Sequence, residues 1–489
     1  MESCVINYLE NKGYSIDTDY YSNINRWIDE WKGNADWLDV RTVEGKSYPM
    51  YSLGMAKRSC EDLASIVTSE PFEIKAKKSD KILQEELKAT KVLSKLATNI
   101  ETMAYSGTVA TVTRIINAEI VGEDENATLR KTNKTKTKTI DIKANQIIPL
   151  TYEDGEIINC AFVSEQKRKI DNKNKKVIYL ELHELEDKGY QVTNIFFDKE
   201  SGKPIQIEGV VETYNTLSTV PLFSICKLPK INVYDNNNEL GMALYGDSED
   251  QLRILDLVYN NFGMDFKLGQ KIMVINKKLV RIETEEYTDK DGSIKTRQRV
   301  VYPNEIQKQL FTEMGTDIMS DATQTPYIYE YNPDLRVGDN KDGIQFALDN
   351  LSFKLGYGTH YYSFDGANMT TATEAILSRS DFVSNGQKIR KAVEQYLQGI
   401  CRSLLLCEKM LGNQSIDEHQ EIEIAEADGF LQDDETERQK LLSDVSAGLI
   451  SKTTYLKKVY RLDDKEIAEE LDRINNEDSI TITEEDISE

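Results

Sequence analysis

Residues 248–269 read SEDQLRILDLVYNNFGMDFKLG and predict an amphipathic helix. Ser248 followed by Gln251 has the pattern of a capping box, and Gly269 marks the end of the helix. The apolar residues on one face of this helix are Leu252, Leu255, Tyr259, Phe262 and Phe266. Because such a stripe must be removed from water, the helix is expected to pack against a neighbouring surface.

Residues 342–356 read DGIQFALDNLSFKLG and predict a second helix of the same character. The pattern stops at Gly356 and Gly358, as is common where a helix ends. Its apolar face consists of Ile344, Ala347, Leu351 and Leu355. The chain therefore has two amphipathic helices that bracket a single insertion.

The insertion between these helices has the pattern of a compact α/β unit. Residues 272–275 and 327–329 are strand-like, and Asp289-Lys290-Asp291-Gly292 is typical of a hairpin turn. A short helix is expected after Pro303-Asn304.

The part of the chain before residue 248 predicts helices followed by a layer of strands. Apolar residues of segment 53–67 recur with helical spacing, residues 70–74 are strand-like, and a second helical stretch is expected over about 83–105. From Val109 to about Cys226, short alternating segments are separated by polar turns. The fold class is therefore α+β.

Two basic runs lie within this strand layer. Residues 134–139 read KTKTKT, and a second run extends from Lys167 to Lys176. Charged edge strands that resist mispairing are favoured for both runs over a nucleic-acid patch, which remains the alternative.

The segment after the second amphipathic helix predicts a loop and then a long helix. Residues 357–370 form the loop, and Thr371 with Glu374 is a capping box for a helix that extends to about residue 413. Asn385-Gly386 is expected to bend or break this helix. His360 beside Tyr361 in the loop is either a base or part of an aromatic packing contact, and packing is favoured.

The C-terminal segment is acidic and helical. Residues 411–489 contain 23 acidic and 8 basic residues, so 23 − 8 = 15 of the 24 net negative charges lie here. Helices are expected over about 434–445, from about Ser451, and from Asp463 with Glu466 in capping-box position. The last residues, 484–489, are expected to be a disordered tail.

The charge of the whole chain excludes several classes of protein. Lysine and arginine number 60 and acidic residues 84, which gives a formal net charge of −24 and opposes binding to DNA phosphates or anionic membranes. No apolar run approaches the roughly 18 residues of a membrane helix, and the first residues lack the pattern of a signal peptide. We therefore expect a protein made in the cytosol that contacts no membrane and reads no DNA sequence.

No arrangement in the sequence is typical of a catalytic, cofactor or metal site, so no residue is assigned to these roles. Gly45-Lys46-Ser47 resembles the end of a phosphate-binding loop, but Val40 stands where the first glycine belongs. The cysteines lack metal-binding spacing and are expected to be reduced, mostly buried thiols. These are Cys4, Cys60, Cys160, Cys226, Cys401 and Cys407, and the histidines His183, His360 and His419 are equally scattered.

The order of these parts resembles the portal proteins of tailed bacteriophages, of the type found in phages of low-GC Gram-positive hosts. The most specific stretches are Tyr362-Ser363-Phe364-Asp365-Gly366 and Thr371-Ala372-Thr373-Glu374-Ala375. Ser52–Lys57, Pro221–Phe223 and Leu240–Ala243 fit the same pattern. The resemblance extends over nearly the whole chain.

This resemblance implies a portal-type architecture with named parts. Residues 1–247 would be the wing, comprising the N-terminal α+β block and the β layer. Helices 248–268 and 338–356 would be the stem, and residues 269–337 the clip. The tunnel loop would be 357–370, the long wing helix 371–413, and the crown with its acidic tail 414–489.

The resemblance also implies a function, that of a ring at one capsid vertex, commonly of twelve subunits. Double-stranded DNA would pass through it non-specifically during packaging and ejection. The partners would be terminase, head-completion or tail connector proteins, and the major capsid and scaffolding proteins. The protein would be a virion component assembled in the host bacterial cytoplasm, without enzymatic activity or cofactor. The alternatives are another phage head-tail connector or capsid structural protein, or a metal-dependent nuclease or hydrolase.

An acidic channel, which makes few contacts that neutralise DNA phosphates, is expected. The interpretation also assigns roles to three sets of residues. The stem stripes named above would pack in the ring, and Thr371 and Glu374 would cap the long helix. The tunnel loop that lines the DNA channel would consist of Tyr357, Gly358, Thr359, His360, Tyr361, Tyr362, Ser363, Phe364, Asp365, Gly366, Ala367, Asn368, Met369 and Thr370.

Overall fold

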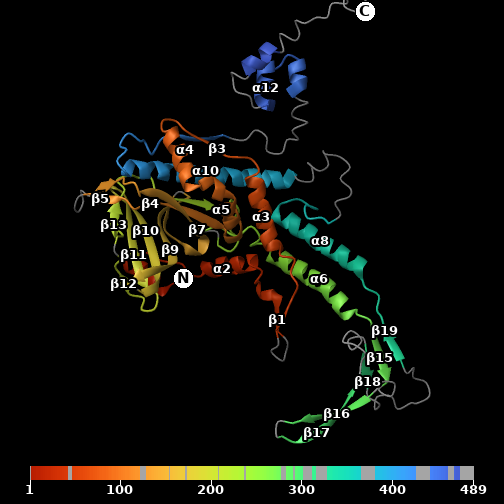
Figure 1. The fold of residues 1–489 in the computed structure, drawn as a ribbon. Coiled ribbons are helices and arrows are strands. Elements are labelled where there is room, and N and C mark those ends of the chain that lie inside the picture. The colour runs from red at the N-terminus through yellow and green to blue at the C-terminus, as the bar shows by residue number, and fades with distance from the viewer. Residues whose placement is uncertain are drawn as a thin grey trace, which may run out of the picture.

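A broad body, a narrow helical arm and a small, separate group of C-terminal helices around α12 (Lys452–Tyr460) make up the described part of the protein (Figure 1). The body combines helices with two main sheets, and the arm consists of two helices that lead to a few distal strands. Helices and strands are thus mixed, as the α+β prediction requires. The computed structural model describes residues 2–41, 47–121, 128–153, 155–170, 173–207, 209–235, 238–276, 282–289, 292–300, 311–314, 328–364, 380–425, 441–460 and 467–473.

The described part of the N-terminal block is built from five helices. They are α1 (Ser3–Asn11), α2 (Tyr20–Trp31), α3 (Met55–Val67), α4 (Asp80–Thr90) and α5 (Val92–Ser106), with the 3-10 turn η1 (Asp36–Leu38) and the strand pair β1 (Asp39–Arg41) and β2 (Ser47–Pro49). Helices α2 to α5 share the main apolar core, while Val5 and Leu9 of α1 pack against strands of the larger sheet. The predicted stripe of α3 is confirmed, because Cys60, Leu63 and Val67 are fully buried.

The helical stretch predicted over 83–105 is confirmed, although it is divided into two helices. The chain forms two helices that meet at Lys91, whose φ of 59° lies in the left-handed region. This conformation disfavours a residue with a side chain, and no turn residue announces it in the sequence. It lets Leu87 before the break and Val92 after it both enter the core.

The β layer consists of a six-stranded and a three-stranded antiparallel sheet. The larger has the order β12-β11-β10-β9-β8, and β13 pairs with β11; the smaller has the order β14-β4-β7. Their strands are β4 (Thr108–Ile116), β7 (Lys136–Lys143), β8 (Ile147–Glu153), β9 (Glu156–Ile170), β10 (Lys173–Glu186), β11 (Gly189–Asp198), β12 (Pro204–Ile205), β13 (Thr213–Asn215) and β14 (Phe223–Lys227). A small hairpin, β5 (Glu119–Val121) with β6 (Thr128–Arg130), and the turn η3 (Ala144–Gln146) complete this region.

The edge-strand interpretation of the basic runs holds for one of them. Strand β7 is at the edge of its sheet, whereas β9 and β10 lie inside theirs. The charged ends of β9 and β10 pair only with each other, since β8 pairs with β9 no further than Phe162 and β11 ends opposite Val177 of β10. The second run is thus the end of a hairpin that extends beyond the sheet.

The long helix α10 (Ser380–Met410) crosses the body and packs on β14, β4 and α3. Gly399 is needed there, because a Cβ atom at this position would lie 2.4 Å from the Ser224 hydroxyl of β14. The predicted break at Asn385-Gly386 is wrong, because the helix continues through both residues. Its buried face carries Val393, Leu397, Leu404 and Cys407.

The arm consists of α6 (Glu249–Leu268) and α8 (Val337–Leu355), which pack on each other. Both helices lie where the sequence predicts them. The capping box at Ser248 is wrong, because the Ser248 hydroxyl contacts Asp247 at 3.0 Å and makes no capping hydrogen bond.

The distal end of the arm holds the strands of the insertion. Strand β15 (Ile272–Asn276) pairs with β18 (Phe311–Met314) and β19 (Ile328–Tyr331). The predicted hairpin is confirmed as β16 (Ile282–Thr288) with β17 (Ile294–Val300). The helix expected after Pro303 lies outside the described residues.

The C-terminal part begins with β20 (Ile422–Ala425), which pairs with β3 (Glu73–Ala76). Helical residues 441–446 end before Gly448, and α12 (Lys452–Tyr460) begins where the sequence predicts. The Ser451 hydroxyl caps α12 by accepting the Thr454 N–H at 3.1 Å. Residues 467–473 are also helical, while the predicted helix start at Asp463 and the tail lie outside the described residues.

Candidate functional site

The arm is joined to the body by acidic side chains of α6. Asp256 is the central one, and it is buried although it lies on the apolar face, four residues after Leu252. Its carboxylate accepts hydrogen bonds from Trp37 Nε1 at 3.0 Å, the Ser52 hydroxyl at 2.8 Å and the Leu53 N–H at 3.1 Å. A buried carboxylate is tolerated only with such partners, so Asp256 fixes the arm to the segment before α3.

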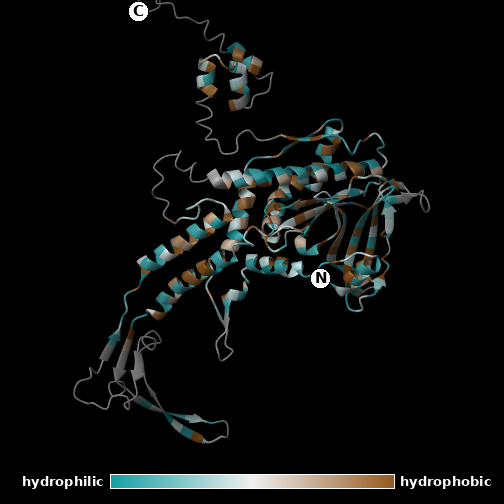
Figure 2. Ribbon diagram, turned by 180° about the vertical axis from the view of Figure 1, so that it is seen from behind, coloured by the Kyte–Doolittle hydropathy of each residue, from teal (hydrophilic) through white to brown (hydrophobic). Residues whose placement is uncertain are grey.

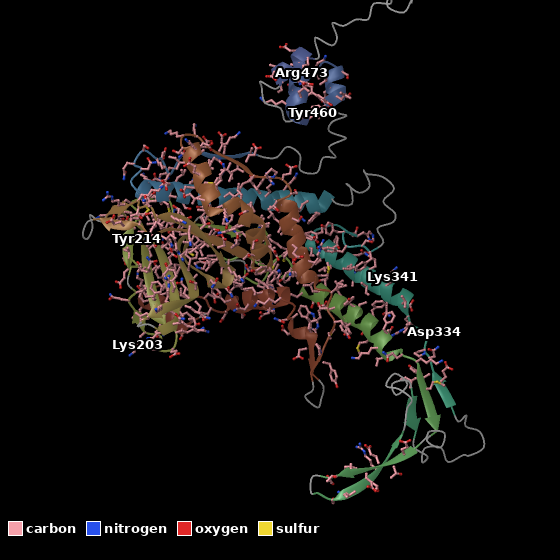
Figure 3. All side chains as sticks on the ribbon, in the orientation of Figure 1. Lys203, Tyr214, Asp334, Lys341, Tyr460 and Arg473 are labelled. Carbon is pink, nitrogen blue, oxygen red and sulfur yellow. The ribbon has the colours of Figure 1, made fainter. Side chains whose placement is uncertain are left out.

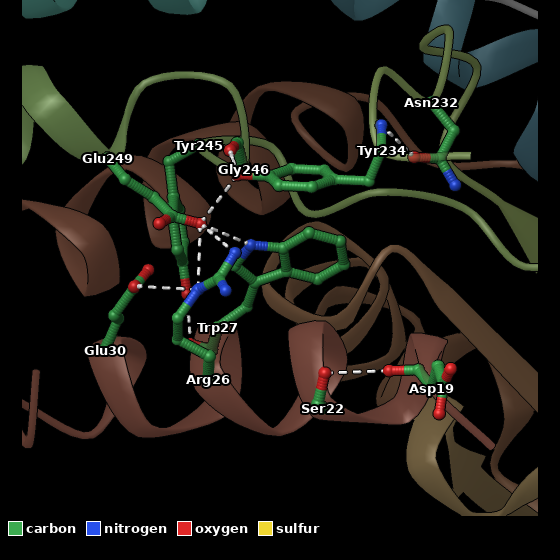
Figure 4. Close-up of polar contacts among 10 residues, drawn as sticks. All are labelled: Asp19, Ser22, Arg26, Trp27, Glu30, Asn232, Tyr234, Tyr245, Gly246 and Glu249. Carbon is green, nitrogen blue, oxygen red and sulfur yellow. Dashed lines mark hydrogen bonds and ion pairs between the residues drawn. The ribbon is translucent and has the colours of Figure 1, made fainter. Parts of the chain in front are cut away.

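Glu249 performs the same role in the first turn of α6 (Figure 4). Its Oε1 atom accepts hydrogen bonds from Arg26 Nη2 at 2.9 Å and Trp27 Nε1 at 2.8 Å, and the Tyr234 hydroxyl lies 3.1 Å away. Trp27 is fully buried and makes edge contacts with the rings of Tyr20 and Tyr234. Glu249 therefore connects the arm to α2 and to the loop before α6.

Glu30 is a second carboxyl group beside this contact (Figure 4). It is 4% exposed, and neither of its oxygens has a hydrogen-bond partner. Arg26 Nε is 3.9 Å from Glu30 Oε1 and 3.2 Å from Glu249 Oε1, so Arg26 is engaged by Glu249. Burial and the negative charge of Glu249 raise the pKa of Glu30 to about 8, and Glu30 is therefore protonated at neutral pH.

Asp265 is the third acidic side chain, and it joins the two arm helices near their distal end. Its carboxylate accepts hydrogen bonds from Arg336 Nη2 and Asn340 Nδ2, both at 2.7 Å. These hydrogen bonds lower the pKa of Asp265. We call Glu249, Asp256 and Asp265 the three acidic anchors of α6.

The predicted stem residues divide into buried and partly exposed positions. Leu252 and Leu255 of α6 share the main core with Ile344, Ala347, Leu351 and Leu355 of α8. Tyr259 and Phe262 are partly buried against that core. Phe266 is 46% exposed and meets Phe262 edge-on, with ring centroids 5.0 Å apart.

Other apolar side chains of the arm face solvent in the single chain. Ile254 and Leu257 of α6 are about half exposed, and Phe346 and Phe353 of α8 are 71% and 68% exposed. Figure 2 shows hydrophobic residues, in brown, on both arm helices. The apolar stripes predicted from the sequence are therefore covered mainly by contacts within the chain. A second apolar surface of the arm, outside these stripes, remains exposed.

The charges on the exposed surface of the arm are nearly balanced. Seven charged residues of α6 and α8 are exposed, and Lys341 is labelled in Figure 3. Three are acidic and four basic, namely Asp250, Asp339, Asp342, Arg253, Lys267, Lys341 and Lys354. The excess of acidic residues in the whole chain, which gives the net charge of −24, is absent from this surface. The reason is that the carboxylates of the three acidic anchors bind partners within the chain.

The segment directly after α8 is held in the body by tyrosines. Tyr357 is 1% exposed, and its hydroxyl donates to the Ser59 carbonyl at 2.8 Å. Tyr362 donates to Asp62 at 2.9 Å, and the rings of Tyr357 and Tyr361 both contact Phe382 of α10. Burial is the main cause that raises the pKa of Tyr362 well above its usual value.

Backbone contacts fix the same segment from two sides. Gly356 has a φ of 77°, and its carbonyl accepts a hydrogen bond from Asn385 Nδ2 at 2.5 Å. Gln345 Nε2 donates to the Tyr362 carbonyl at 2.9 Å, and His360 Nδ1 is 3.0 Å from Asp349. Tyr357 therefore belongs to the core and offers no surface to a channel.

The remaining residues of the predicted loop are only partly described. Phe364 is 68% exposed, and residues 365–370 lie outside the described residues, as do the predicted cap residues Thr371 and Glu374. The tunnel role of the loop stays a prediction, and Thr359, His360 and Phe364 are exposed among its described residues.

The described residues hold no arrangement that suggests a catalytic or metal centre. All six cysteines are free; five are buried, and burial raises the pKa of thiols such as Cys60. His183 is fully buried between the rings of Phe162 and Phe223. Across these residues, no group of three or more His, Cys, Asp or Glu side chains is placed to bind a metal ion. Nor is any described helix both long and apolar enough to cross a membrane.

The acidic anchors and Glu30 were missed by sequence reasoning. Asp256 does leave a signal, because a carboxylate inside an apolar stripe needs a buried partner. Glu249 and Asp265 leave none, because acidic residues are common on helix surfaces.

One of the comparisons with known proteins, the family match given below, agrees with the resemblance noted in the sequence. A chain in the solved structure "Neck of native GTA particle computed with C12 symmetry" is 10% identical, with a TM-score of 0.37, over 83% of this chain and 89% of that chain. A likeness this low carries no argument here. No curated protein matches the chain. The family described as "Phage portal protein, SPP1 Gp6-like" matches residues 14–483. Because this match spans both arm helices and nearly all of the body, the chain belongs to the SPP1 Gp6-like family of phage portal proteins.

Proposed function

We propose that this portal protein forms a closed ring in which α6 and α8 are the stem. The observation that carries the proposal is the exposed apolar surface on both helices. Phe346 and Phe353 are seven residues apart, which places them on one face of α8, and Ile254 and Leu257 lie on α6. Apolar surface on two different helices suits a head-to-tail contact, in which α6 of one copy meets α8 of the next.

The same assignment extends the portal names to the rest of the chain. The body before α6 is the wing, the distal strands are the clip, α10 is the long wing helix, and the segments after β20 belong to the crown. The ring sits at one capsid vertex in the virion, commonly with twelve subunits. Its clip receives terminase and then connector proteins, while capsid and scaffolding proteins surround the wing.

Double-stranded DNA passes through this ring without specific binding. The exposed charges of the stem nearly cancel, so few DNA phosphates are neutralised and few counterions are released there. The sequence predicts an acidic channel. We propose instead that the part of the channel wall formed by the stem carries nearly balanced charges. Residues 363–370 form the tunnel loop, and its base is held by Tyr357 and Tyr362.

Native mass spectrometry of a double variant tests the ring. Phe346→Gln with Phe353→Gln removes apolar contact area between subunits and leaves the buried stripe of α8 intact, so we expect folded monomers. The matched control is Leu217→Asn, which changes an apolar side chain that is 76% exposed at a backbone position with a φ of 55°, where Asn is well tolerated. Normal rings from the Phe346/Phe353 variant would show that the contact lies elsewhere.

The tunnel loop is tested separately by shortening residues 363–370. The stem contacts are unchanged, so rings should form, and DNA-filled heads should be lost in a complementation assay. Full yields of infectious particles would contradict the assignment.

A further inference from the structure

Three lysines of the β layer line one shallow hollow beside strand β7. Side chains alternate along a strand, so Lys136 and Lys138 project to the same side, and Lys134 reaches it from the preceding turn. The hollow measures about 380 Å³ and is lined by Ile116, Asn117, Asn133, Lys134, Lys136 and Lys138.

These lysines differ from their neighbours in having no carboxylate partner among the residues that the structure describes. Nearby, Lys131 binds both oxygens of Glu408 at 2.9 and 3.1 Å, and Lys95 is 3.9 Å from Asp141. Three like charges on adjacent positions repel one another. An anion in the hollow relieves this repulsion.

The turn that presents Lys134 is fixed by its own hydrogen bonds. Asn117 has a φ of 56°, and its carbonyl accepts the hydroxyls of Thr132 at 3.1 Å and Thr135 at 3.0 Å. Asn117 Nδ2 donates to the Lys134 carbonyl at 3.4 Å. Because this turn of the backbone is already ordered, little of its conformational entropy is lost when a ligand binds.

The hollow lies far from the stem. It adjoins hairpin β5–β6, which Figures 1 and 2 place at the end of the body opposite α6 and α8. In the proposed ring, on which this inference rests, the end of the body at hairpin β5–β6 is the outer rim. DNA in the channel does not reach it.

We propose that this lysine hollow binds an extended acidic segment of a protein partner at the rim of the portal. Lys136 and Lys138 are two residues apart on a strand, or about 7 Å, which matches alternate side chains of an extended peptide. Duplex DNA fits less well, since it carries one charge per roughly 1.7 Å and most of those charges would face a protein of net charge −24. Glu119 lines only the adjoining hollow, opposite Arg130 across the hairpin.

Fluorescence anisotropy with the full-length protein tests this site. The probe is a labelled peptide of alternating Ser and Glu, compared with its Ser-Gln counterpart and with a short DNA duplex. The protein should bind the Ser-Glu peptide, more weakly as ionic strength rises, and should not bind the Ser-Gln peptide. Lys134→Gln with Lys136→Gln and Lys138→Gln should weaken binding roughly tenfold, as expected for three exposed ion pairs.

A second triple variant controls for net charge. Lys167→Gln with Lys169→Gln and Lys188→Gln removes the same charge from exposed lysines elsewhere in the β layer, and should leave binding within about twofold. An equal loss in both variants would overturn the site, as would DNA binding lost only in the first variant. Absence of peptide binding by the unmodified protein would also overturn it.

Ring formation is measured on the same samples by native mass spectrometry. Monomers that still bind the peptide would contradict the proposed ring and leave the hollow supported. Rings that do not bind it would contradict only the hollow.

Discussion

The body of this portal protein buries its largest apolar side chains within the chain, whereas each arm helix buries one apolar face and leaves other apolar side chains exposed. In the body, large side chains such as Trp27, Phe162 and Tyr245 are fully buried within the chain. In the arm, Phe346 and Phe353 of α8 remain about 70% exposed. The core of the body is thus complete within one chain, whereas the exposed face of the arm is the surface that the proposed ring would cover.

The largest loss of subunit stability is expected when a core residue of the body is removed. Trp27→Ala should lower the free energy of unfolding of the subunit by about 3–5 kcal/mol, because it leaves a large cavity and removes one of the hydrogen bonds to Glu249. Trp27→Phe, which keeps most of the volume but loses the N–H, should cost less. Chemical denaturation monitored by circular dichroism measures both, and equal losses would show that the hydrogen bond rather than packing dominates.

The joint between the two regions should be the next most sensitive position. Asp256→Ala leaves Trp37 Nε1, the Ser52 hydroxyl and the Leu53 N–H without their acceptor, and should cost about 2–3 kcal/mol of subunit stability. Asp250→Ala, on the exposed side of the same helix, is the control and should have little effect. A denaturation midpoint unchanged by Asp256→Ala would mean that the arm is held to the body by apolar contacts alone.

Glu30 permits a test in which stability rises. The folded pKa of Glu30 is about 8 and its unfolded value is ordinary, so the folded state holds a proton that the unfolded state loses between these values. Subunit stability therefore falls as pH rises through this interval and is constant above it. Glu30→Gln removes the dependence and should stabilise the subunit by roughly 1–3 kcal/mol at pH 8, but hardly at pH 4.

The control for this pH effect is an exposed carboxyl group. Glu85→Gln changes a surface residue of α4 and should give the same stability difference at every pH. If Glu30→Gln behaved likewise, Glu30 would be ionised in the folded protein at neutral pH.

The smallest effect on the subunit is expected at the exposed face of the arm. Ile254→Gln with Leu257→Gln should change the free energy of unfolding by less than about 0.5 kcal/mol per site, because these side chains are half exposed in the single chain. Ring formation should nevertheless decrease, as measured by mass photometry. A large loss of subunit stability would show that these residues serve the body rather than a neighbour.

The arm helices could be predicted closely because their signals are local. Helical spacing marks α6 and α8, and Gly269 and Gly356 mark their ends. The paired strands β16 and β17 follow in the same way from their turn residues. The portal family was recognised from motifs spread over the whole chain, which the family match confirms.

The parts that could not be predicted depend on contacts between distant segments. Lys91 adopts a left-handed conformation because packing on both sides requires it, and its sequence context resembles an ordinary helix. Tyr357 follows a glycine and predicts a loop, yet it is buried because α3 and α10 meet around it. Asp256 acquires its role from Trp37 and Ser52, more than 200 residues earlier in the chain.

The spacing of the three acidic anchors has a mechanical consequence. Helix α6 has 20 residues, or about 30 Å, and Glu249, Asp256 and Asp265 attach it to α2, to the segment before α3, and to α8. No span between anchors exceeds about 14 Å, which is short for a helix to bend under load. The arm thus acts as a stiff lever whose free end bears strands β15 to β19. A force on these strands would therefore act on the hydrogen bonds of Asp256 and Glu249, where the arm joins the body, instead of bending α6.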